Sequence, residues 1–412
     1  GPVNFYQRPD ERYSAGFFAE YEVNPYVNVY SNFMFMDYKS NAQIAPSGNF
    51  FSTQGISCDN PLLSATQRSQ LCEVDLVPDI DDPDDVAEFL ALNPNGGQDF
   101  INATLGVQNA LTGGAPRLNA DGTVSVTPFD GVSPAYIGRR NVEGGGRQDT
   151  LGYQTFRGVI GMNGDLYNAP GFTYDISAQY SKVNLTRAYR NEFSTVRLNR
   201  ALDVVTGDGT GELAAGEIGC RSVDDGTDAN CVPWNIFQLG GVTQEALNYL
   251  QVPLLQNGTT EQSVVTASLT GDLTGYGFKL PTAERGLQVA GGVEYRRDAI
   301  SQQVDVSFAT GDGAGQGGPT LPLSGSIDSY DLFTEFQLPL VEGRPGIELL
   351  AVDGAFRYSD YSTGISAESW KVGGEYAPTS DLRIRGSFQN AVRAPNVIDL
   401  FQSQGFNLFD LD

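Results

Sequence analysis

The sequence predicts an all-β fold: an antiparallel transmembrane β-barrel, present in part as about ten membrane strands with long extracellular loops. Three observations predict it: a two-residue alternation of apolar and polar side chains, unusually long alternating segments, and connectors that are alternately short and long. The clearest segment is 381–393. Successive side chains of a strand point to opposite faces. One face would therefore carry Leu382, Ile384, Gly386, Phe388 and Val392, and the other Asp381, Arg383, Arg385, Ser387, Gln389 and Arg393.

The alternating segments are long as well as numerous. Strands in globular proteins most often have about five or six residues, whereas a tilted strand needs about 9–11 to cross a bilayer. Most of the segments reach the second length. The predicted strands are 14–23, 26–38, 149–162, 172–184, 263–272, 287–298, 330–340, 352–359, 370–376 and 381–393.

Connector length gives these strands an orientation. In an antiparallel arrangement every second connector lies on the same side, and outer-membrane barrels have tight turns on one rim and long loops on the other. The predicted short connectors are 24–25, 163–171, 275–285, 341–346 and 378–380. The opposite set is 39–148, 185–261, 299–327, the brief 362–367, and the residues after Ala394. We therefore expect residues 1–412 to form one partial barrel with long extracellular loops at 39–148, 185–261 and 299–327. Segments 134–142 and 186–200 are expected to be extended within these loops.

Aromatic residues gather near both ends of the predicted strands. Amphipathic rings prefer the two interfaces of a bilayer. One group lies beside the short turns and consists of Tyr21, Tyr26, Phe172, Tyr276, Phe278 and Tyr376. The other lies near the opposite ends and consists of Tyr295, Tyr358, Tyr361 and Trp370.

Alternation alone does not separate a lipid-facing surface from the core face of a soluble β-sandwich. Strand length and connector asymmetry favour the membrane barrel. In lipid every backbone N–H and C=O must be paired within the sheet, which only a closed barrel achieves among β-structures.

Composition excludes several functions. The chain has 412 residues, a net charge of −25 and no histidine. Without histidine, Ser-His-Asp or Cys-His catalysis and His-ligated zinc are excluded within this chain. The acidic charge disfavours nucleic-acid binding. No apolar run is long enough for a transmembrane helix, and residues 1–4 carry no signal-peptide features. The chain is therefore expected to be cytosolic or to lack its true N-terminus. We expect no enzyme activity and no cofactor.

Two loop features carry alternative interpretations. The acidic run 79–85 could bind calcium through clustered carboxylates, but it lacks the spacing of an EF-hand loop, so a solvated loop is expected. The four cysteines form two local pairs in polar stretches, Cys58 with Cys72 and Cys220 with Cys231. Two loop disulfides formed in an oxidising compartment are the simplest interpretation, and four unpaired buried thiols are the alternative.

Four stretches resemble one family, the TonB-dependent outer-membrane receptors. The first is Gln43–Phe50 with Cys58–Ser64 and Leu71–Cys72, and the second is Cys231–Phe237 with Gly240, Gly241, Glu245 and Ala246. The third is Gly291–Arg297. The fourth is Phe356–Ser362 with Trp370, Lys371, the rim motif Arg393, Pro395 and Asn396, and Asp399–Phe401. Each is weak alone, but their order and spacing are specific to the family.

The resemblance implies a barrel of about 22 strands with an N-terminal plug, set in the outer membrane of a Gram-negative bacterium. The chain would then be the central part of the barrel, without plug, TonB box or C-terminal strands; a complete ten-stranded barrel is the alternative. The implied function is TonB-dependent uptake of a scarce nutrient such as a ferric siderophore, cobalamin or an oligosaccharide. The implied partners are outer-membrane lipid, the TonB complex acting through the plug, and the small-molecule substrate. A passive porin-like channel and a soluble β-rich carbohydrate-binding protein are the alternatives.

Charged side chains on the polar strand faces would point into the barrel lumen, where they would pair with the plug or line a hydrated path. Generic hydration of the wall without ligand contact is one alternative, and direct substrate binding is the other; contact with wall and plug is favoured over direct substrate binding. These lumen-facing candidates are Glu294, Arg296, Asp331, Glu335, Asp353, Arg357, Lys371, Glu375, Arg383, Arg385 and Arg393. Proline cannot donate to a β-ladder, so Pro395 is expected to end the last strand at the outer rim.

Overall fold

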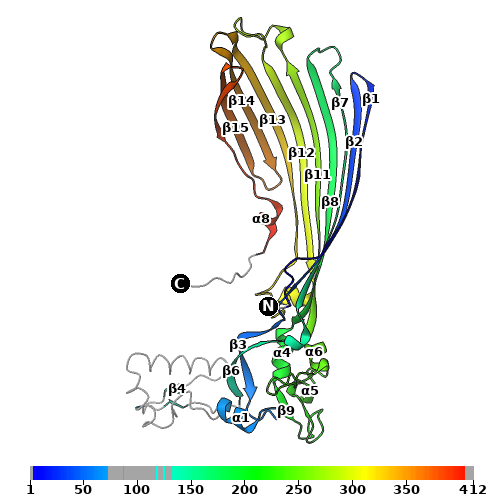
Figure 1. The fold of residues 1–412 in the computed structure, drawn as a ribbon, viewed down its shortest axis with the longest axis vertical. Coiled ribbons are helices and arrows are strands. Elements are labelled where there is room, and N and C mark those ends of the chain that lie inside the picture. Colours follow the sequence, from blue (N-terminus) through cyan, green and yellow to red (C-terminus); the bar gives the residue numbers. More distant parts are fainter. Residues whose placement is uncertain (1–2, 73–86, 88–116, 119–123, 126–131, 404–412) are drawn as a thin grey trace.

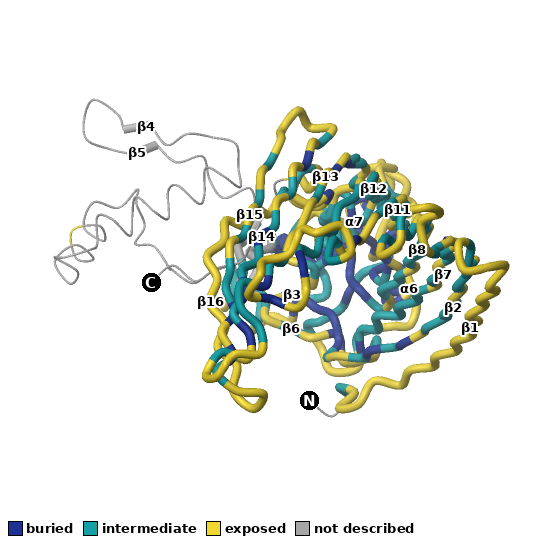
Figure 2. The backbone as a smooth tube through the Cα atoms, turned by 90° about the horizontal axis from the view of Figure 1, so that it is seen from above, coloured by how far each residue is buried: buried dark blue, intermediate teal, exposed yellow. Residues whose placement is uncertain are grey.

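The computed structural model describes residues 3–72, 87, 117–118, 124–125 and 132–403. Ten of its strands form one sheet, and each of these strands pairs antiparallel with the next one along the chain. Figure 2 shows that the sheet bends into an open arc, with β1 and β16 at its two edges. The ten strands are β1 (Asp10–Asn24), β2 (Val27–Ile44), β7 (Arg147–Asp165), β8 (Phe172–Phe193), β11 (Gln251–Asp272), β12 (Gln288–Val304), β13 (Leu323–Arg344), β14 (Ile347–Tyr361), β15 (Ser366–Thr379) and β16 (Leu382–Asn390).

The ten predicted strands all exist, but most extend further than the alternation indicated. The difference is largest at the end with the long connectors, where β8 continues to Phe193 and β11 already begins at Gln251. The connectors at that end are 45–146, 194–250, 305–322 and 362–365. At the other end, tight turns such as 25–26 and 345–346 join the strands. Figure 1 shows this asymmetry along the vertical axis of the sheet.

The long connectors carry a second folded unit, here called the cap, which consists of residues 45–72, 132–146, 194–250 and 305–322. Its buried core includes Ile56, Leu198, Leu202, Trp234 and Leu250. Because these side chains come from different connectors, the core joins segments far apart in the sequence. The elements of the cap are β3 (Gly48–Ser57), α1 (Ala65–Cys72), β6 (Val132–Arg140), η1 (Val142–Gly144), α4 (Thr195–Leu202), β9 (Val204–Thr206), β10 (Ile218–Cys220), α5 (Arg221–Asp224), α6 (Gln244–Leu250) and α7 (Val306–Thr310).

The remaining elements are short. Strands β4 (Arg117–Leu118) and β5 (Val124–Ser125) pair with each other, and η2 (Thr274–Tyr276) lies in the connector between β11 and β12. Helix α8 (Val397–Phe401) follows β16. Among the described residues, no helix is long and apolar enough to cross a membrane. The acidic run 79–85 lies outside the described residues.

One of the two segments expected to be extended in the loops is partly helical. Residues 132–140 do form a strand, β6, which pairs with β3, but residues 195–202 form helix α4. The Ser194 side chain accepts a hydrogen bond from the backbone N–H of Arg197, which caps the helix. Leu198, Ala201 and Leu202 lie on one helical face and are buried in the cap core. The strand prediction was wrong there because this three- and four-residue spacing was not recognised.

The structure forms the predicted disulfide between Cys220 and Cys231, whose Cα atoms lie 6.0 Å apart. Cys58 is also disulfide-bonded. The Cys72 side chain lies outside the described residues, so its pairing with Cys58 stays a prediction. The bridge between Cys220 and Cys231 joins β10 to the segment leading to Trp234 within the cap core.

Candidate functional site: the two faces of the barrel wall

The register of the sheet separates charged side chains from apolar ones. Glu294 of β12 lies opposite Asp331 of β13, and Asp331 lies opposite Ser359 of β14. Residues directly opposite one another share a face. The neighbouring row on the other face runs from Val293 through Leu332 to Tyr358. The wall therefore has one polar face and one apolar face across at least these three strands.

The apolar face continues around the whole arc and is exposed. At least one large hydrophobic side chain is exposed on every strand of the sheet. An exposed apolar surface of this extent marks contact with a membrane or a partner. The face includes Phe17, Phe33, Ile160, Ile176, Val265, Leu269, Val293, Leu332, Phe336, Phe356, Val372, Ile384 and Phe388.

Aromatic rings border the apolar face at both ends, as the sequence predicted. At the tight-turn end, the rings of Phe172 and Tyr276 meet edge to face at 5.8 Å, and the Tyr376 hydroxyl donates to the carbonyl oxygen of Gly346 at 2.8 Å. At the long-connector end, Tyr295 and Tyr330 lie with their ring centroids 5.1 Å apart. The positions of the two bands indicate where the two bilayer interfaces lie.

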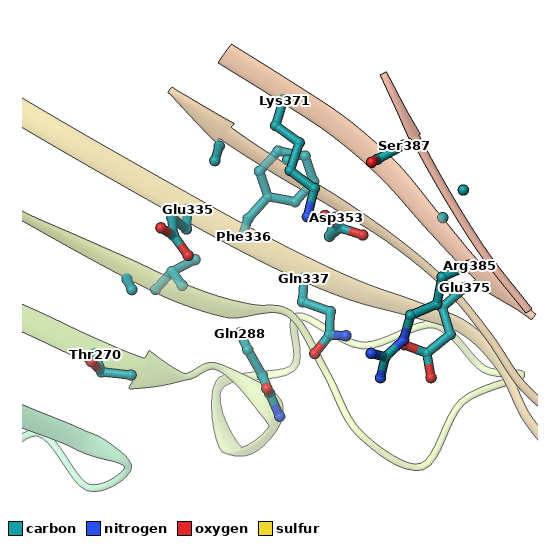
Figure 3. Close-up of a pocket in the computed structure, with 16 residues that line it drawn as sticks. Thr270, Gln288, Glu335, Phe336, Gln337, Asp353, Lys371, Glu375, Arg385 and Ser387 are labelled. Atoms are coloured by element: carbon teal, nitrogen blue, oxygen red, sulfur yellow. Dashed lines mark hydrogen bonds and ion pairs between the residues drawn. The ribbon is translucent and has the colours of Figure 1, made fainter. Parts of the chain in front are cut away.

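The polar face is the concave one. A hollow of about 600 Å³ opens on it and spans β11 to β16, lined by Gln288, Glu335, Asp353, Lys371 and Arg385 among others. Figure 3 shows these side chains projecting from neighbouring strands into one space. Ten of the eleven predicted lumen-facing residues lie on this face. They are Glu294, Arg296, Asp331, Glu335, Asp353, Arg357, Lys371, Glu375, Arg383 and Arg385.

The charges of the concave face form ion pairs between strands. Arg357 of β14 contacts Asp331 of β13 and Glu294 of β12, each at 3.1 Å. Asp331 is buried and also accepts hydrogen bonds from Ser329 at 3.1 Å and from Ser359. This group fixes β12, β13 and β14 relative to one another at the level of the aromatic pair Tyr295 and Tyr330.

Two further ion-pair groups lie toward β16. Glu375 of β15 forms an ion pair with Arg383 at 2.9 Å and accepts a hydrogen bond from Arg385 at 3.1 Å. Lys371 contacts Asp353 at 2.8 Å. Both arginines and the lysine remain about half exposed to the hollow. Their charge is thus available to a second surface or to solutes inside the arc.

The last predicted lumen-facing residue, Arg393, is not on the wall. The strand was predicted to reach it, but β16 ends at Asn390. Arg393 lies in the segment before α8 and pairs with Asp399 at 2.8 Å. Asn396 and Asp399 form a capping box at the start of α8. Asn396 of the rim motif therefore starts a helix. The strand ends at Asn390, so Pro395 is not the residue that ends it.

Helix α8 turns back toward the sheet and packs against β12 and β13. The ring of Phe401 covers Gly325, where an added Cβ would lie 2.3 Å from the ring. A second hollow lies between residues 394–398 and the wall around Arg296, Asp331 and Arg357. Pro395 and Asn396 of the rim motif therefore lie beside the ion pair of Arg357 and Asp331.

Sequence reasoning missed an acidic region on the concave face at the other end of the arc. Glu20, Glu22, Asp165 and Asp175 line a hollow near the tight turns between β1 and β11. The Tyr30 hydroxyl donates to Asp175 at 3.0 Å. The same alternation that identified the charges of 287–393 would have identified Glu20, Glu22 and Asp175 in segments 14–23 and 172–184, whereas Asp165 lies beyond the predicted strand 149–162. Within the described part of the chain, no group of three or more His, Cys, Asp or Glu side chains could hold a metal ion.

A two-faced wall of long, consecutive antiparallel strands is typical of outer-membrane barrels, and the family comparison agrees. Residues 92–410 match the family described as TonB dependent receptor-like, beta-barrel. The chain belongs to this family. TonB-dependent receptors reside in the outer membrane of Gram-negative bacteria and transport nutrients across it; they are transporters rather than enzymes. They interact with TonB and with outer-membrane lipids. No curated protein matches the chain.

The cap of this TonB-dependent receptor contains a charged group outside the membrane wall. Asp228 accepts from the Tyr249 hydroxyl and from Arg200, each at 2.8 Å. Burial acts to raise the pKa of Asp228, but the hydrogen bonds from Tyr249, the Asn230 backbone and Arg200 outweigh it, so the pKa is lowered. Burial and the bond to Asp228 raise the pKa of Tyr249.

This group makes the cap sensitive to acid. A lowered folded-state pKa contributes stability above the ordinary carboxyl pKa, and that stability is lost as the pH falls through the folded-state value. We expect the urea midpoint of the cap to fall between pH 7 and pH 3, measured by the fluorescence of Trp234 in a Trp370→Phe background. Asp228→Asn should lower the midpoint at pH 7 and reduce the difference between the two pH values. Glu245→Gln, an exposed acid on α6, should retain the wild-type difference; equal pH differences in all three proteins would contradict the assignment.

Proposed function

We propose that the chain forms part of the barrel wall and the extracellular cap of a TonB-dependent active transporter that takes up a scarce nutrient. The observation that carries this proposal is the two-faced wall, apolar on its convex side and lined by paired charges on its concave side. The convex face suits lipid, and the concave face suits a hydrated lumen. The substrate would be a ferric siderophore, cobalamin or an oligosaccharide.

The wall would act by binding and by hydration, without chemistry of its own. Three partly exposed basic side chains would face the plug that fills the lumen in this family. They are Lys371, Arg383 and Arg385. The substrate would first meet the cap, on the extracellular side, and then pass between plug and wall when the TonB complex pulls the plug. The energy would come from the proton gradient of the inner membrane through TonB.

Uptake by whole cells tests this proposal. Cells that express the full receptor would be given labelled ferric siderophores, cobalamin and oligosaccharides in parallel, with TonB present or deleted. We expect one class to accumulate against its gradient only when TonB is present. Equal uptake without TonB would instead support a passive porin-like channel. Recovery of the protein in the soluble fraction without detergent would support a soluble carbohydrate-binding protein and contradict the proposal.

A further inference from the structure

Glu192 is a buried carboxylate at the junction of the wall and the cap. It lies next to the end of β8 and is 1% exposed. A buried charge is costly unless hydrogen bonds and opposite charges surround it. Its partners therefore show which parts of the chain the fold holds together at this point.

The partners of Glu192 come from separate parts of the chain. Ser47, at the start of connector 45–146, donates its hydroxyl to Oε1. From connector 305–322, the backbone N–H of Gly315 donates to Oε1 at 3.1 Å and the Gln316 side chain donates to Oε2 at 3.1 Å. Arg147, the first residue of β7, places its guanidinium 3.6 Å from Oε2. One carboxylate thus contacts two long connectors and stands beside the start of the third, 194–250.

The connectors 194–250 and 305–322 are also joined directly. Ser194 and Gly313 form an antiparallel β-bridge. Asp312 accepts from the Thr195 hydroxyl at 3.0 Å and from the backbone N–H of Val196 at 2.9 Å, at the start of α4. The backbone N–H of Ala314 donates to the carbonyl oxygen of Phe193 at 2.8 Å. A helix in one connector is thus capped by an acid from another.

These contacts depend on one another. Losing one donor leaves the buried carboxylate with too few hydrogen bonds. The free energy of the closed arrangement then rises, and the remaining donors are held in place less strongly. A Cβ added at Gly315 would meet the Arg147 guanidinium and Oε2 of Glu192, so connector 305–322 passes directly against this group. Opening one connector therefore disturbs the contacts of the other two.

We propose that the described segments 45–50, 194–200 and 312–316, which belong to the three long connectors, open and close as one body and that Glu192 is the latch that couples them. A ligand that moves one of these segments would then move all three, so they respond as one unit rather than as three independent loops. This inference goes beyond the proposed function, because it concerns how the cap moves whichever nutrient is carried.

Hydrogen exchange of the whole receptor in detergent tests the latch, because exchange reports local opening segment by segment. Glu192→Gln keeps the size of the side chain but removes its charge. We expect it to speed exchange in segments 45–50, 194–200 and 312–316 together, by about tenfold or more, as expected for the loss of hydrogen bonds to a charged group. The matched control is Glu143→Gln. Glu143 pairs with Arg139 at 2.6 Å within a single connector, so its loss should speed exchange only near 139–144.

Faster exchange confined to 190–194 in Glu192→Gln, or a response in one connector alone, would overturn the proposal. If Glu192→Gln fails to fold, Ser47→Ala supplies the test, because Ser47 touches the latch from connector 45–146. We expect Ser47→Ala to speed exchange at 312–316, because in the described structure the Ser47 hydroxyl reaches that segment through the Glu192 carboxylate. A response limited to 45–50 and 192–193 would equally overturn the coupling.

Discussion

Replacing Val293 with arginine is expected to destabilise the barrel wall by up to about 2–4 kcal/mol, the cost of a basic side chain on the lipid face of an outer-membrane barrel, which is largest at the bilayer midplane and falls toward the interfaces. Val293 lies on the apolar face in the same row as Tyr358, on the membrane side of the aromatic band that contains Tyr295, and its side chain is 54% exposed. In water an exposed arginine on a sheet would cost little. The expected penalty therefore arises only if this face meets lipid. Urea unfolding of the receptor reconstituted in lipid vesicles measures the effect.

Thr266→Arg is the matched control. Thr266 lies opposite Glu294 on the concave face, and its hydroxyl donates to that carboxylate at 3.3 Å. An arginine there meets an acid and a polar surface, so we expect a change within about 0.5 kcal/mol. Equal destabilisation by Val293→Arg and Thr266→Arg would contradict the assignment of the two faces.

Removing the Cys220–Cys231 disulfide is expected to destabilise the cap by about 2–4 kcal/mol, the usual contribution of a native disulfide. Both cysteines belong to the buried cap core that contains Trp234. The effect should be largest in the cap, because both cysteines lie in the cap core, which meets the sheet wall at the end of β8 through Phe193. Unfolding of the double variant Cys220→Ala with Cys231→Ala, followed at Trp234 in a Trp370→Phe background, measures it.

The same double variant followed at Trp370, in a Trp234→Phe background, should show an unchanged wall transition. Ser222→Ala is a suitable control, because Ser222 is buried beside Cys220 without taking part in the disulfide. Chemical reduction of the Trp370→Phe protein should shift the Trp234 transition at least as far, because it opens the disulfide of Cys58 as well. A Trp234 transition that does not move would show that the cap does not depend on this bridge.

The sequence predicts the wall better than the cap, for a physical reason. Along β12 and β16 the side chains alternate between lipid and a polar interior, so the two-residue period is visible in the residues themselves. Strand ends carry no such signal where β8 and β11 continue beyond the bilayer, because both faces there meet protein and water. The extension of β8 to Phe193 was therefore not predicted.

The cap depends on contacts between residues far apart in the sequence. Leu198 and Leu202 indicate a helix only when their spacing is recognised, and nothing near Glu192 indicates that Ser47 and Gly315 will meet it. The same holds for Arg393, whose place next to Asp399 depends on the chain leaving the ladder at Asn390. The two-residue alternation is enough to assign each charged side chain of the wall to one face. Predicting which charges form ion pairs also requires the register between neighbouring strands.

Fluorescence quenching of Trp370 by lipids with brominated acyl chains tests the account most directly. Trp370 lies on the convex face, partly exposed, and packs against Phe388 with ring centroids 5.6 Å apart. In a Trp234→Phe receptor reconstituted in such lipids, we expect strong quenching by bromine and little quenching by iodide in the water. Quenching by iodide without quenching by the brominated lipid would contradict a membrane-spanning wall and, with it, the proposed transport function.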